Sequence, residues 1–162
     1  MNIGAWNIRG LNESLKQQVV IDFVNKEKLD ILAVMETRVK PQNFEQINRR
    51  RFSKYKVIHN YNYHPNCRIW IVNNPGTTHI DVLSSSKQAI HCQVKCNILN
   101  KNICISFIYG SNDAQERMQL WTKIHQISQM NHLPWLLMGD FNVVASIMER
   151  GRDCPPKMND IA

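Results

Sequence analysis

The sequence has 162 residues, a length that suits one domain and allows about two thirds of the unfolded chain's surface to be buried. Its 20 Lys and Arg residues outnumber 13 Asp and Glu residues, which gives a formal net charge of +7 at pH 7. A basic balance of this size favours an anionic partner such as nucleic acid, although it does not define the fold. No apolar run is long enough for a membrane span, so we expect no membrane partner, and no feature calls for an obligate protein partner.

The cysteines and the N-terminus bear on localisation and on metal binding. Five cysteines are an odd number, and the first residues lack the charged and apolar segments of an export signal. We therefore predict reduced thiols in a nuclear or cytoplasmic protein that is not secreted. Cys92 and Cys96 share one face of a predicted strand while His91 points the other way, so packed cysteines are favoured over a zinc site. His91 is expected to be exposed.

The first part of the chain predicts a strand, a helix and a second strand. Residues 2–7 form the first strand, and Asn12 is placed to cap the helix that follows. The apolar residues of this helix recur on one face: Leu15, Val19, Phe23 and Val24. Residues 29–35 are apolar except for Asp30, which is typical of a strand in the middle of a sheet with both faces covered. Glu36 comes directly after this strand.

The segment at residues 41–56 is polar and basic. Three arginines stand in a row there: Arg49, Arg50 and Arg51. The segment is either a solvated helix face and loop or a surface that contacts a phosphate backbone. On the second interpretation, these arginines and Arg68 are the residues that bind nucleic acid. Trp70 lies in an apolar segment and is placed in the core, with stacking on a base as the less favoured alternative.

The middle of the chain predicts β structure. Strands at residues 55–60, 68–72 and 78–83 are separated by short turns, which favours a meander of consecutive antiparallel strands. Residues 90–98 alternate between apolar and polar, and a short turn leads from them into a strand at 103–109. This pair is predicted to be an antiparallel hairpin.

A helix and a buried strand follow. Asp113 and Glu116 are spaced as an Asp version of a capping box. The helix carries four apolar residues inward: Leu120, Trp121, Ile124 and Ile127. The apolar run at 135–138 ends at a glycine, and Asp140 and Asn142 come next, with side chains on the same side of an extended or turning backbone. Such a pair suits a reaction site, but a turn capped by Asp140 accounts for the local pattern equally well.

Five polar residues stand at or just past the ends of predicted strands. They are Asn7, Glu36, Tyr109, Asp140 and Asn142. If the strands share one direction within their sheets, these side chains gather at one rim, where α/β proteins usually bind ligands. Two acids, two amides and a phenol are suitable partners for Mg²⁺ and a phosphate group. The pattern therefore predicts a site that handles phosphate.

Four blocks of sequence, in this order, resemble the endonuclease/exonuclease/phosphatase superfamily. They are Trp-Asn-Ile-Arg-Gly-Leu-Asn (6–12), Met-Glu-Thr-Arg (35–38), Ile-Tyr-Gly (108–110) and Met-Gly-Asp-Phe-Asn-Val-Val (138–144). Shorter blocks are similar to the endonuclease of plant non-LTR (LINE-type) retrotransposons: Cys-Arg-Ile-Trp (67–70), Gln-Ala-Ile-His (88–91), Leu-Trp (120–121) and Pro-Trp (134–135). The resemblance spans the chain from Asn2 to about Arg150.

The resemblance implies a magnesium-dependent phosphodiesterase that nicks DNA. Glu36 would bind Mg²⁺, or Mn²⁺, which polarises the scissile phosphate. Asp140 would be the general base for the attacking water, an effect worth about 10² to 10⁴ in rate. Asn7 and Asn142 would position the phosphate and the metal-bound groups. Tyr109 would donate a hydrogen bond to the phosphate.

The implied fold is α/β, a two-sheet sandwich of the DNase I-like type over residues 1–150, with a loop-like tail at 151–162. Two departures bear on activity. Arg9 stands where many relatives have an acid, as it does in plant retrotransposon versions. The closing Ser-Asp-His block of the family is absent, and no histidine follows His132. We therefore expect an incomplete second sheet with an uncovered apolar edge, and impaired catalysis, because losing one preorganised group costs about 10² to 10³ in rate.

Two other functions stay open. One is a non-catalytic nucleic-acid-binding remnant, which depends on the basic residues alone. The other is a phosphoesterase that acts on a small phosphate ester, against which stand the basic balance and the retrotransposon-like blocks.

Overall fold

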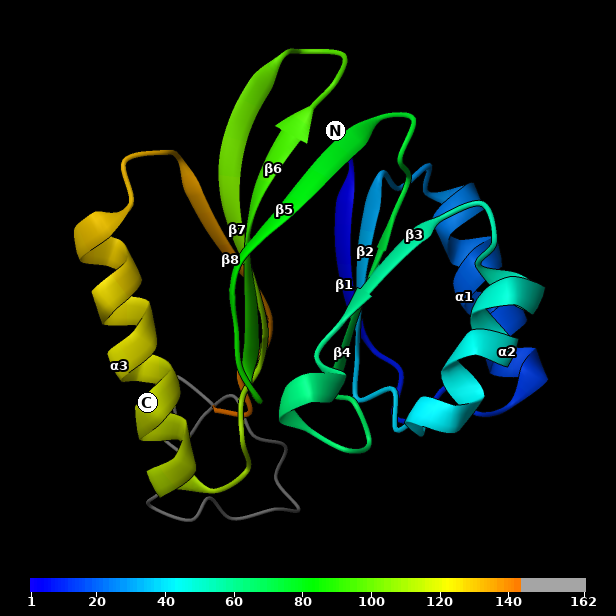
Figure 1. Cartoon of the computed structure of the whole chain (residues 1–162), viewed down its shortest axis with the longest axis horizontal. Helices are drawn as coiled ribbons and strands as arrows, with labels where there is room; N and C mark the ends of the chain where they lie inside the picture. Colours follow the sequence, from blue (N-terminus) through cyan, green and yellow to red (C-terminus); the bar gives the residue numbers. More distant parts are fainter. Residues whose placement is uncertain (144–162) are drawn as a thin grey trace, which may run out of the picture.

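The computed structural model describes residues 1–143, in which eight strands form two sheets and three α-helices cover the outer faces (Figure 1). The strands are β1 (Ile3–Asn7), β2 (Ile31–Met35), β3 (Lys56–His59), β4 (Ile69–Asn73), β5 (Thr78–Ser85), β6 (Ala89–Cys96), β7 (Lys101–Tyr109) and β8 (Trp135–Asp140). The helices are α1 (Ser14–Lys26), α2 (Pro41–Arg51) and α3 (Ala114–Met130), with a short 3-10 helix at Tyr61–Tyr63. The predicted α/β sandwich is confirmed. The tail predicted at 151–162 lies outside the described residues.

The first sheet has the strand order β1-β2-β4-β3. β1 runs parallel to β2, and β4 is antiparallel to both β2 and β3. All five residues of β2 are buried, as the apolar run predicted. Ile31, Ala33 and Met35 belong to the core between the sheets. Leu32 and Val34 alternate with them and belong to the core beneath the helices.

The second sheet has the strand order β5-β6-β7-β8, with β7 and β8 parallel and the other pairs antiparallel. The predicted hairpin is present as β6 and β7. The predicted meander is wrong, because β3 and β4 belong to the first sheet whereas β5 belongs to the second. β2 and β3 already pair with the two edges of β4, so β5 has no free edge there and the chain crosses between the sheets. Asn73 Nδ2 donates a hydrogen bond of 3.3 Å to the backbone oxygen of Thr78 across this crossing.

Both sheets are covered on their outer faces, the first by α1 and α2 and the second by α3 (Figure 1). A core of aliphatic residues lies between the sheets, and another lies between the first sheet and its two helices. In the latter, Trp70 packs edge-on against Phe44 and Phe52 and is fully buried, which confirms its place in the core. Coverage of both faces explains why β2 is apolar along its whole length and β4 is apolar up to Asn73.

Helix α1 buries a face that only partly matches the predicted one, because Val24 and Phe23 pack into the core as predicted but Leu15 and Val19 do not. Val20 and Val24 are buried together with Gln17, whereas Leu15 is 74% exposed and Val19 is 43% exposed. Gln17 Nε2 donates hydrogen bonds of 3.0 and 3.2 Å to two backbone oxygens of the loop before the helix. These bonds turn the Gln17 side of the helix towards the sheet, so a polar residue sets the buried face.

The N-termini of α1 and α3 are capped differently. Asn12 does not cap α1, because its Nδ2 donates to the backbone oxygen of Arg38 at 3.1 Å, and Glu13 at the cap position makes no side-chain bond. Asp113 does cap α3, as predicted, by accepting a hydrogen bond of 2.8 Å from the backbone N–H of Glu116. The local capping signal was therefore correct only where no distant partner competed for the side chain.

The four cysteines in the described part of the chain are buried, as predicted: Cys67, Cys92, Cys96 and Cys104. Burial raises the pKa of the Cys92 thiol to about 12. The prediction for His91 is wrong, because this side chain is buried beside Trp135, and its Nδ1 lies 2.8 Å from the hydroxyl oxygen of Ser106. No helix within residues 1–143 has the length and apolar character needed to cross a membrane.

Candidate active site

The two sheets are joined at one rim, where the ends of β1 and β8 meet. Asn7 is the last residue of β1, and its Nδ2 donates a hydrogen bond of 2.7 Å to Oδ2 of Asp140, the last residue of β8. The strand register places Tyr109 opposite Asp140 in the second sheet. In the first sheet, Asn7 stands opposite Met35, the residue before Glu36. Strand register therefore brings residues from four strand ends to the same rim.

The Asp140 carboxylate is held by neutral donors on both oxygens. The backbone N–H of Asn142 donates to Oδ1 at 2.9 Å, and Asn7 occupies Oδ2. Asn142 Nδ2 donates to the backbone oxygen of Gly110 at 2.6 Å, and the N–H of Gly110 donates to the backbone oxygen of Asp140 at 2.8 Å. Because a carboxylate oxygen accepts more than one hydrogen bond, each oxygen keeps capacity for a further donor such as water.

The close approach of β7 and β8 requires glycine at two positions. Gly139 has a φ of +142°, and a Cβ there would lie 2.0 Å from the backbone oxygen of Ile108. A Cβ on Gly110 would lie 2.3 Å from the backbone oxygen of Phe141. Asn142 adopts a φ of +52°, in the left-handed region that asparagine tolerates better than most residues. This backbone turns the Asn142 side chain back towards the strand ends.

Glu36 lies just beyond β2 in a left-handed conformation, with a φ of +55°. Its N–H donates to the backbone oxygen of Arg68 at 2.7 Å, and its own oxygen accepts from the N–H of Gly10 at 2.8 Å. The side chain is only 10% exposed and forms an ion pair with Arg38. Sequence reasoning missed Arg38, although its place two residues after Glu36 allows both side chains to reach the same side of the backbone.

Tyr109 is buried at the end of β7, and its hydroxyl oxygen accepts a hydrogen bond of 3.3 Å from Arg68 Nη1. The Arg68 guanidinium also lies 5.3 Å from the centre of the phenol ring. Burial raises the pKa of Tyr109, and the charge of Glu36 adds to the rise, whereas Arg68 and a hydrogen bond with Asn142 oppose it. The phenol is therefore protonated at neutral pH and has a proton to donate.

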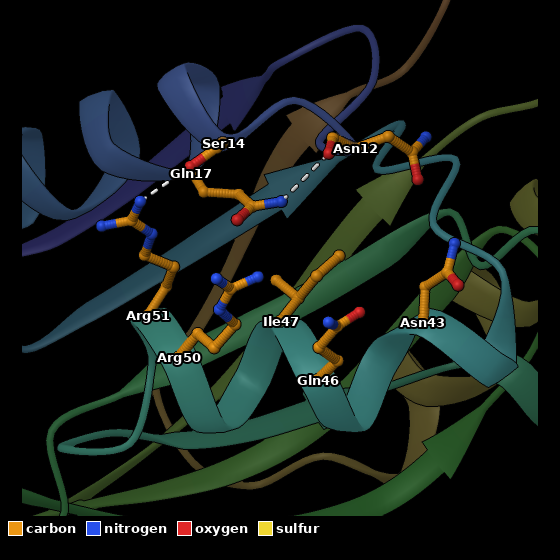
Figure 2. A pocket seen from close by; sticks show the side chains of 8 residues that line it. All are labelled: Asn12, Ser14, Gln17, Asn43, Gln46, Ile47, Arg50 and Arg51. Carbon is orange, nitrogen blue, oxygen red and sulfur yellow. Dashed lines mark hydrogen bonds between the residues drawn. The ribbon is translucent and has the colours of Figure 1, made fainter.

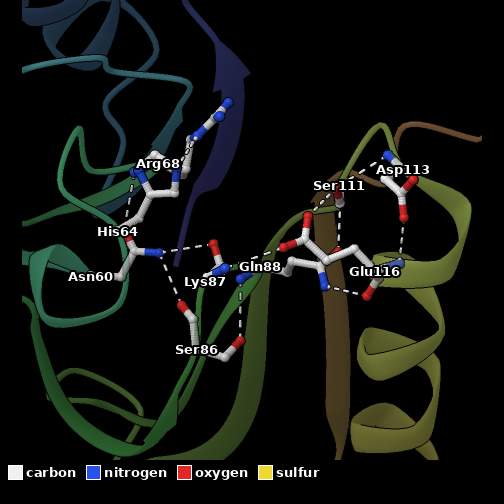
Figure 3. Close-up of polar contacts among 9 residues, drawn as sticks. All are labelled: Asn60, His64, Arg68, Ser86, Lys87, Gln88, Ser111, Asp113 and Glu116. Atoms are coloured by element: carbon white, nitrogen blue, oxygen red, sulfur yellow. Dashed lines mark hydrogen bonds and ion pairs between the residues drawn. The ribbon is translucent and has the colours of Figure 1, made fainter.

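A network of polar contacts holds the loop before β4 against the second sheet and the start of α3 (Figure 3). Asn60 is 1% exposed, and its Oδ1 accepts a hydrogen bond of 3.1 Å from the backbone N–H of Arg68. Its Nδ2 donates hydrogen bonds to the backbone oxygens of Ser86 and Lys87. Gln88 extends the network by donating to the backbone oxygen of Glu116 at 2.8 Å. Sequence reasoning missed Asn60, because an asparagine in a loop has the appearance of an ordinary turn residue.

The arginines predicted to bind nucleic acid lie in two places. Arg68 is at the rim, in contact with Tyr109. The other three, Arg49 to Arg51, are the last residues of α2, which begins close after Glu36 and is about 16 Å long. The structure therefore separates these three side chains from the rim by most of a helix. Arg49 forms an ion pair of 3.7 Å with Glu45 of the same helix.

The two carboxylates at the rim, those of Glu36 and Asp140, suit a divalent cation that takes few of its ligands from the protein. Among residues 1–143, no three His, Cys, Asp or Glu side chains come together as a metal-binding group. Mg²⁺ commonly takes one or two carboxylates and completes its shell with waters and substrate phosphates. Glu36 is a nearly buried carboxylate that already has a cationic partner in Arg38, and the rim adds the carboxylate of Asp140 and the amide oxygen of Asn7. Carboxylate and amide oxygens are the kind of ligand that a hard divalent cation takes, so the residues present are compatible with such an ion.

Together, the two-sheet α/β sandwich and the acids and amides at its joined strand ends agree with the DNase I-like fold that the sequence predicted. The sequence matches the Endonuclease/Exonuclease/phosphatase family over residues 4–157, and the chain belongs to this family. No curated protein matches the sequence significantly.

Several solved structures share the fold. The endonuclease domain of TRAS1, a telomere-specific non-LTR retrotransposon, has a TM-score of 0.67 at 12% identity, over 87% of this chain and 60% of that domain. A family protein from Bacteroides thetaiotaomicron has a TM-score of 0.65 at 14% identity, over 88% of this chain and 64% of its own. TDP2 of D. rerio, complexed with a single-strand DNA product, has a TM-score of 0.61 at 14% identity, over 90% and 62%. The chain thus spans less than two thirds of each of these structures, and at these identities the likeness concerns the fold.

Proposed function

We propose that this chain is a DNA endonuclease that depends on Mg²⁺ or Mn²⁺ and hydrolyses a phosphodiester at the rim formed by β1, β2, β7 and β8. The hydrogen bond between Asn7 and Asp140 carries the proposal, because it unites the two sheets around an acid that stays accessible to water. The side chains of Glu36 and Tyr109 stand at the same rim. The basic balance of the sequence, +7 at pH 7, favours a polyanionic substrate.

In this proposal, Asp140 takes a proton from the attacking water, because its two neutral donors orient the carboxylate without neutralising it. Tyr109 donates its phenolic proton in a hydrogen bond to a non-bridging phosphate oxygen. Asn142 and Asn7 hold the general base and the phosphate in register. Glu36 would hold the divalent cation, whose chemistry when bound is to polarise the phosphate and offset its developing charge.

Arg68 has a supporting role in this proposal. It contacts the Tyr109 hydroxyl and the Tyr109 ring, so it fixes the phenol and adds positive charge beside the phosphate. A guanidinium is well suited to phosphate, since it presents several N–H donors in one plane. Within residues 1–143, Arg68 Nε also donates a hydrogen bond of 3.3 Å to His64 Nε2, and burial lowers the pKa of this imidazole, so His64 is a neutral partner.

A retrotransposon origin of the LINE type is part of the proposal. The sequence blocks at 67–70 and 88–91 support it, and so does the likeness to the TRAS1 endonuclease domain. Arg9 at the position where many family members have an acid agrees with the plant versions.

A plasmid-nicking assay tests the proposal. Supercoiled DNA is incubated with the chain in Mg²⁺, in Mn²⁺ and in EDTA, beside an Asp140→Ala variant. We expect nicking only with a divalent ion and a loss of about 10² or more in the variant. Equal nicking rates of the two proteins would show that Asp140 is not the general base. Bis-p-nitrophenyl phosphate serves as the small substrate, and preference for it over DNA would favour a small-ester phosphoesterase instead.

A second candidate is a nucleic-acid-binding protein without catalysis. The ion pair between Glu36 and Arg38 favours it, because the acid expected to hold the cation is engaged by a side chain of the chain itself. This candidate predicts salt-sensitive DNA binding that Asp140→Ala leaves intact, with no nicking by either protein.

A further inference from the structure

A polar pocket of about 240 Å³ lies between α1 and α2, outside the rim (Figure 2). Its wall includes seven polar side chains: Asn12, Ser14, Gln17, Asn43, Gln46, Arg50 and Arg51. The residues that line it include no Asp or Glu. Figure 2 shows Arg50 and Arg51 reaching from α2 towards α1, so both guanidinium groups border the same space. The pocket therefore concentrates positive charge and hydrogen-bond donors.

Within residues 1–143, no Asp or Glu side chain pairs with the two arginines of this pocket. Arg51 donates to the side-chain oxygens of Gln18 and Ser14 at 2.8 and 2.7 Å, and both partners are uncharged. Arg50 makes no hydrogen bond or ion pair with any residue in the described part of the chain. Arg49, by contrast, pairs with Glu45 and does not line the pocket. The structure thus distinguishes three consecutive arginines that the sequence presents as one basic run.

The edge of the pocket formed by Asn12 lies close to the candidate active site. Asn12 comes five residues after Asn7, and five residues of chain span at most about 17 Å. The loop between them is fastened to the Glu36 segment, because the N–H of Leu11 donates to the backbone oxygen of Thr37 at 2.7 Å. Each strand of B-DNA advances about 3.4 Å per base along the helix axis, so this reach corresponds to roughly five base steps. One bound duplex is long enough to meet both places.

We propose that the pocket between α1 and α2 binds a backbone phosphate of the DNA whose scissile phosphate lies at Asp140. The inference rests on the proposed function and extends it, since a small phosphate ester cannot occupy both places. Arg50 supplies a guanidinium that no side chain of residues 1–143 engages and that can bond to two phosphate oxygens. Arg51 adds a second charge from a side chain already held by α1. The contact reads no sequence and serves to hold the duplex in register.

Arg50→Gln tests this inference, with Arg49→Gln as the matched control. Each variant removes one positive charge from adjacent positions of α2, inside and outside the pocket respectively. Binding of a labelled duplex of about 20 base pairs is followed by fluorescence anisotropy in EDTA over a series of salt concentrations. We expect Arg50→Gln to weaken binding about fivefold to tenfold and to lower the salt slope by about one, and Arg49→Gln to weaken it less than twofold. Equal losses of DNA affinity in the two variants would contradict phosphate binding in the pocket.

Duplex length and a free anion provide further checks. An unlabelled dinucleotide is too short to reach from the rim to the pocket, so it should displace the labelled duplex from wild type far less well than an unlabelled duplex of about 20 base pairs does. A thermal-shift experiment with inorganic phosphate distinguishes a site for a free anion from a site for a DNA phosphate. If phosphate stabilises wild type but not Arg50→Gln, while the long duplex binds both equally, the DNA assignment is overturned.

Failure of the inference and failure of the proposed function give different results. Asp140→Ala tests the chemistry and is expected to keep the full affinity for the long duplex. Arg50→Gln is expected to raise the KM for nicking and to leave kcat unchanged. If nicking is insensitive to Asp140→Ala, the proposed function is contradicted. The comparison of Arg50→Gln with Arg49→Gln uses DNA affinity alone to test whether the pocket binds a phosphate.

Discussion

The side-chain amide of Asn7 donates a hydrogen bond of 2.7 Å to Asp140, a residue 133 positions further along the chain. The bond joins the last residue of β1 to the last residue of β8, and so joins the two sheets at their shared rim. The N–H of Asn142 holds the other oxygen of the same carboxylate at 2.9 Å. Asp140 is therefore oriented by neutral groups, and each of its carboxylate oxygens can still accept a hydrogen bond from a further donor.

Asn7→Ala is expected to lower the nicking rate by about 10²-fold, because misplacing a catalytic group by about 1 Å has an effect of this size. Affinity for a DNA duplex should change less than twofold. The control is Asn2→Ala, since Asn2 lies next to β1 but its side chain donates to the backbone oxygen of Lys28. Plasmid nicking and fluorescence anisotropy provide the two measurements. A variant that nicks at the wild-type rate would show that Asp140 needs no support from Asn7.

Gly139→Ala should destabilise the fold by about 2 to 3 kcal/mol, since the new Cβ would meet the backbone of β7 in a conformation that L residues rarely adopt. Gly76→Ala is the control, because the nearest atom to a Cβ there is the side-chain oxygen of Asn74 at 3.3 Å. We expect the control to change stability by less than about 1 kcal/mol. Urea unfolding measures both. Equal stabilities of the two variants would contradict the close approach of β7 and β8.

Tyr109 should make the free energy of unfolding depend on pH in the alkaline range. Burial raises the folded-state pKa of this phenol above its ordinary value of 10.0. The folded state then binds the proton more tightly, so this contribution is fully present below pH 10.0 and is lost as pH rises through the folded-state pKa. Tyr109→Phe should flatten the fall in stability above this pH, as measured by urea unfolding.

The matched control for that measurement is Tyr63→Phe, because the Tyr63 residue is 47% exposed. It should leave the alkaline fall in stability as it is in wild type. Arg68→Gln provides an independent check, since the Arg68 charge and hydrogen bond lower the pKa of Tyr109. Its removal is expected to shift the spectroscopic titration of Tyr109 to higher pH. A shift to lower pH would contradict the contact between the guanidinium and the phenol.

Glu36→Gln should abolish stabilisation of the protein by Mg²⁺. At a Mg²⁺ concentration ten times its Kd, binding to the folded state alone adds about 1.4 kcal/mol to the free energy of unfolding. Glu45→Gln removes an exposed carboxylate of α2 and is expected to keep this effect. Arg38→Gln should lower the Mg²⁺ concentration needed, because Arg38 competes for the same carboxylate. Thermal shift measures all four proteins, and a full Mg²⁺ response in Glu36→Gln would exclude Glu36 as a ligand.

Local sequence was sufficient for the strands that are covered on both faces and for the polar residues at their ends. Residues 31–35 and 69–73 form strands that are buried throughout, and such strands appear in a sequence as apolar runs without alternation. A strand that ends in Gly139 followed by Asp140 signals both a sharp turn and an acid beyond it. The roles assigned to these residues in catalysis remain proposals.

What the sequence by itself determined is which segments are apolar enough to be strands, and which acids, amides and phenol follow them, because burial on both faces and turn chemistry are properties of neighbouring residues. Only the tertiary structure decided that β5 leaves the first sheet, that α1 turns its Gln17 side inward, and that His91 is buried. It also decided that Arg68 lies on Tyr109 while Arg50 faces a separate pocket. Each of these outcomes depends on a partner far away in the chain, and local periodicity carries no information about such partners.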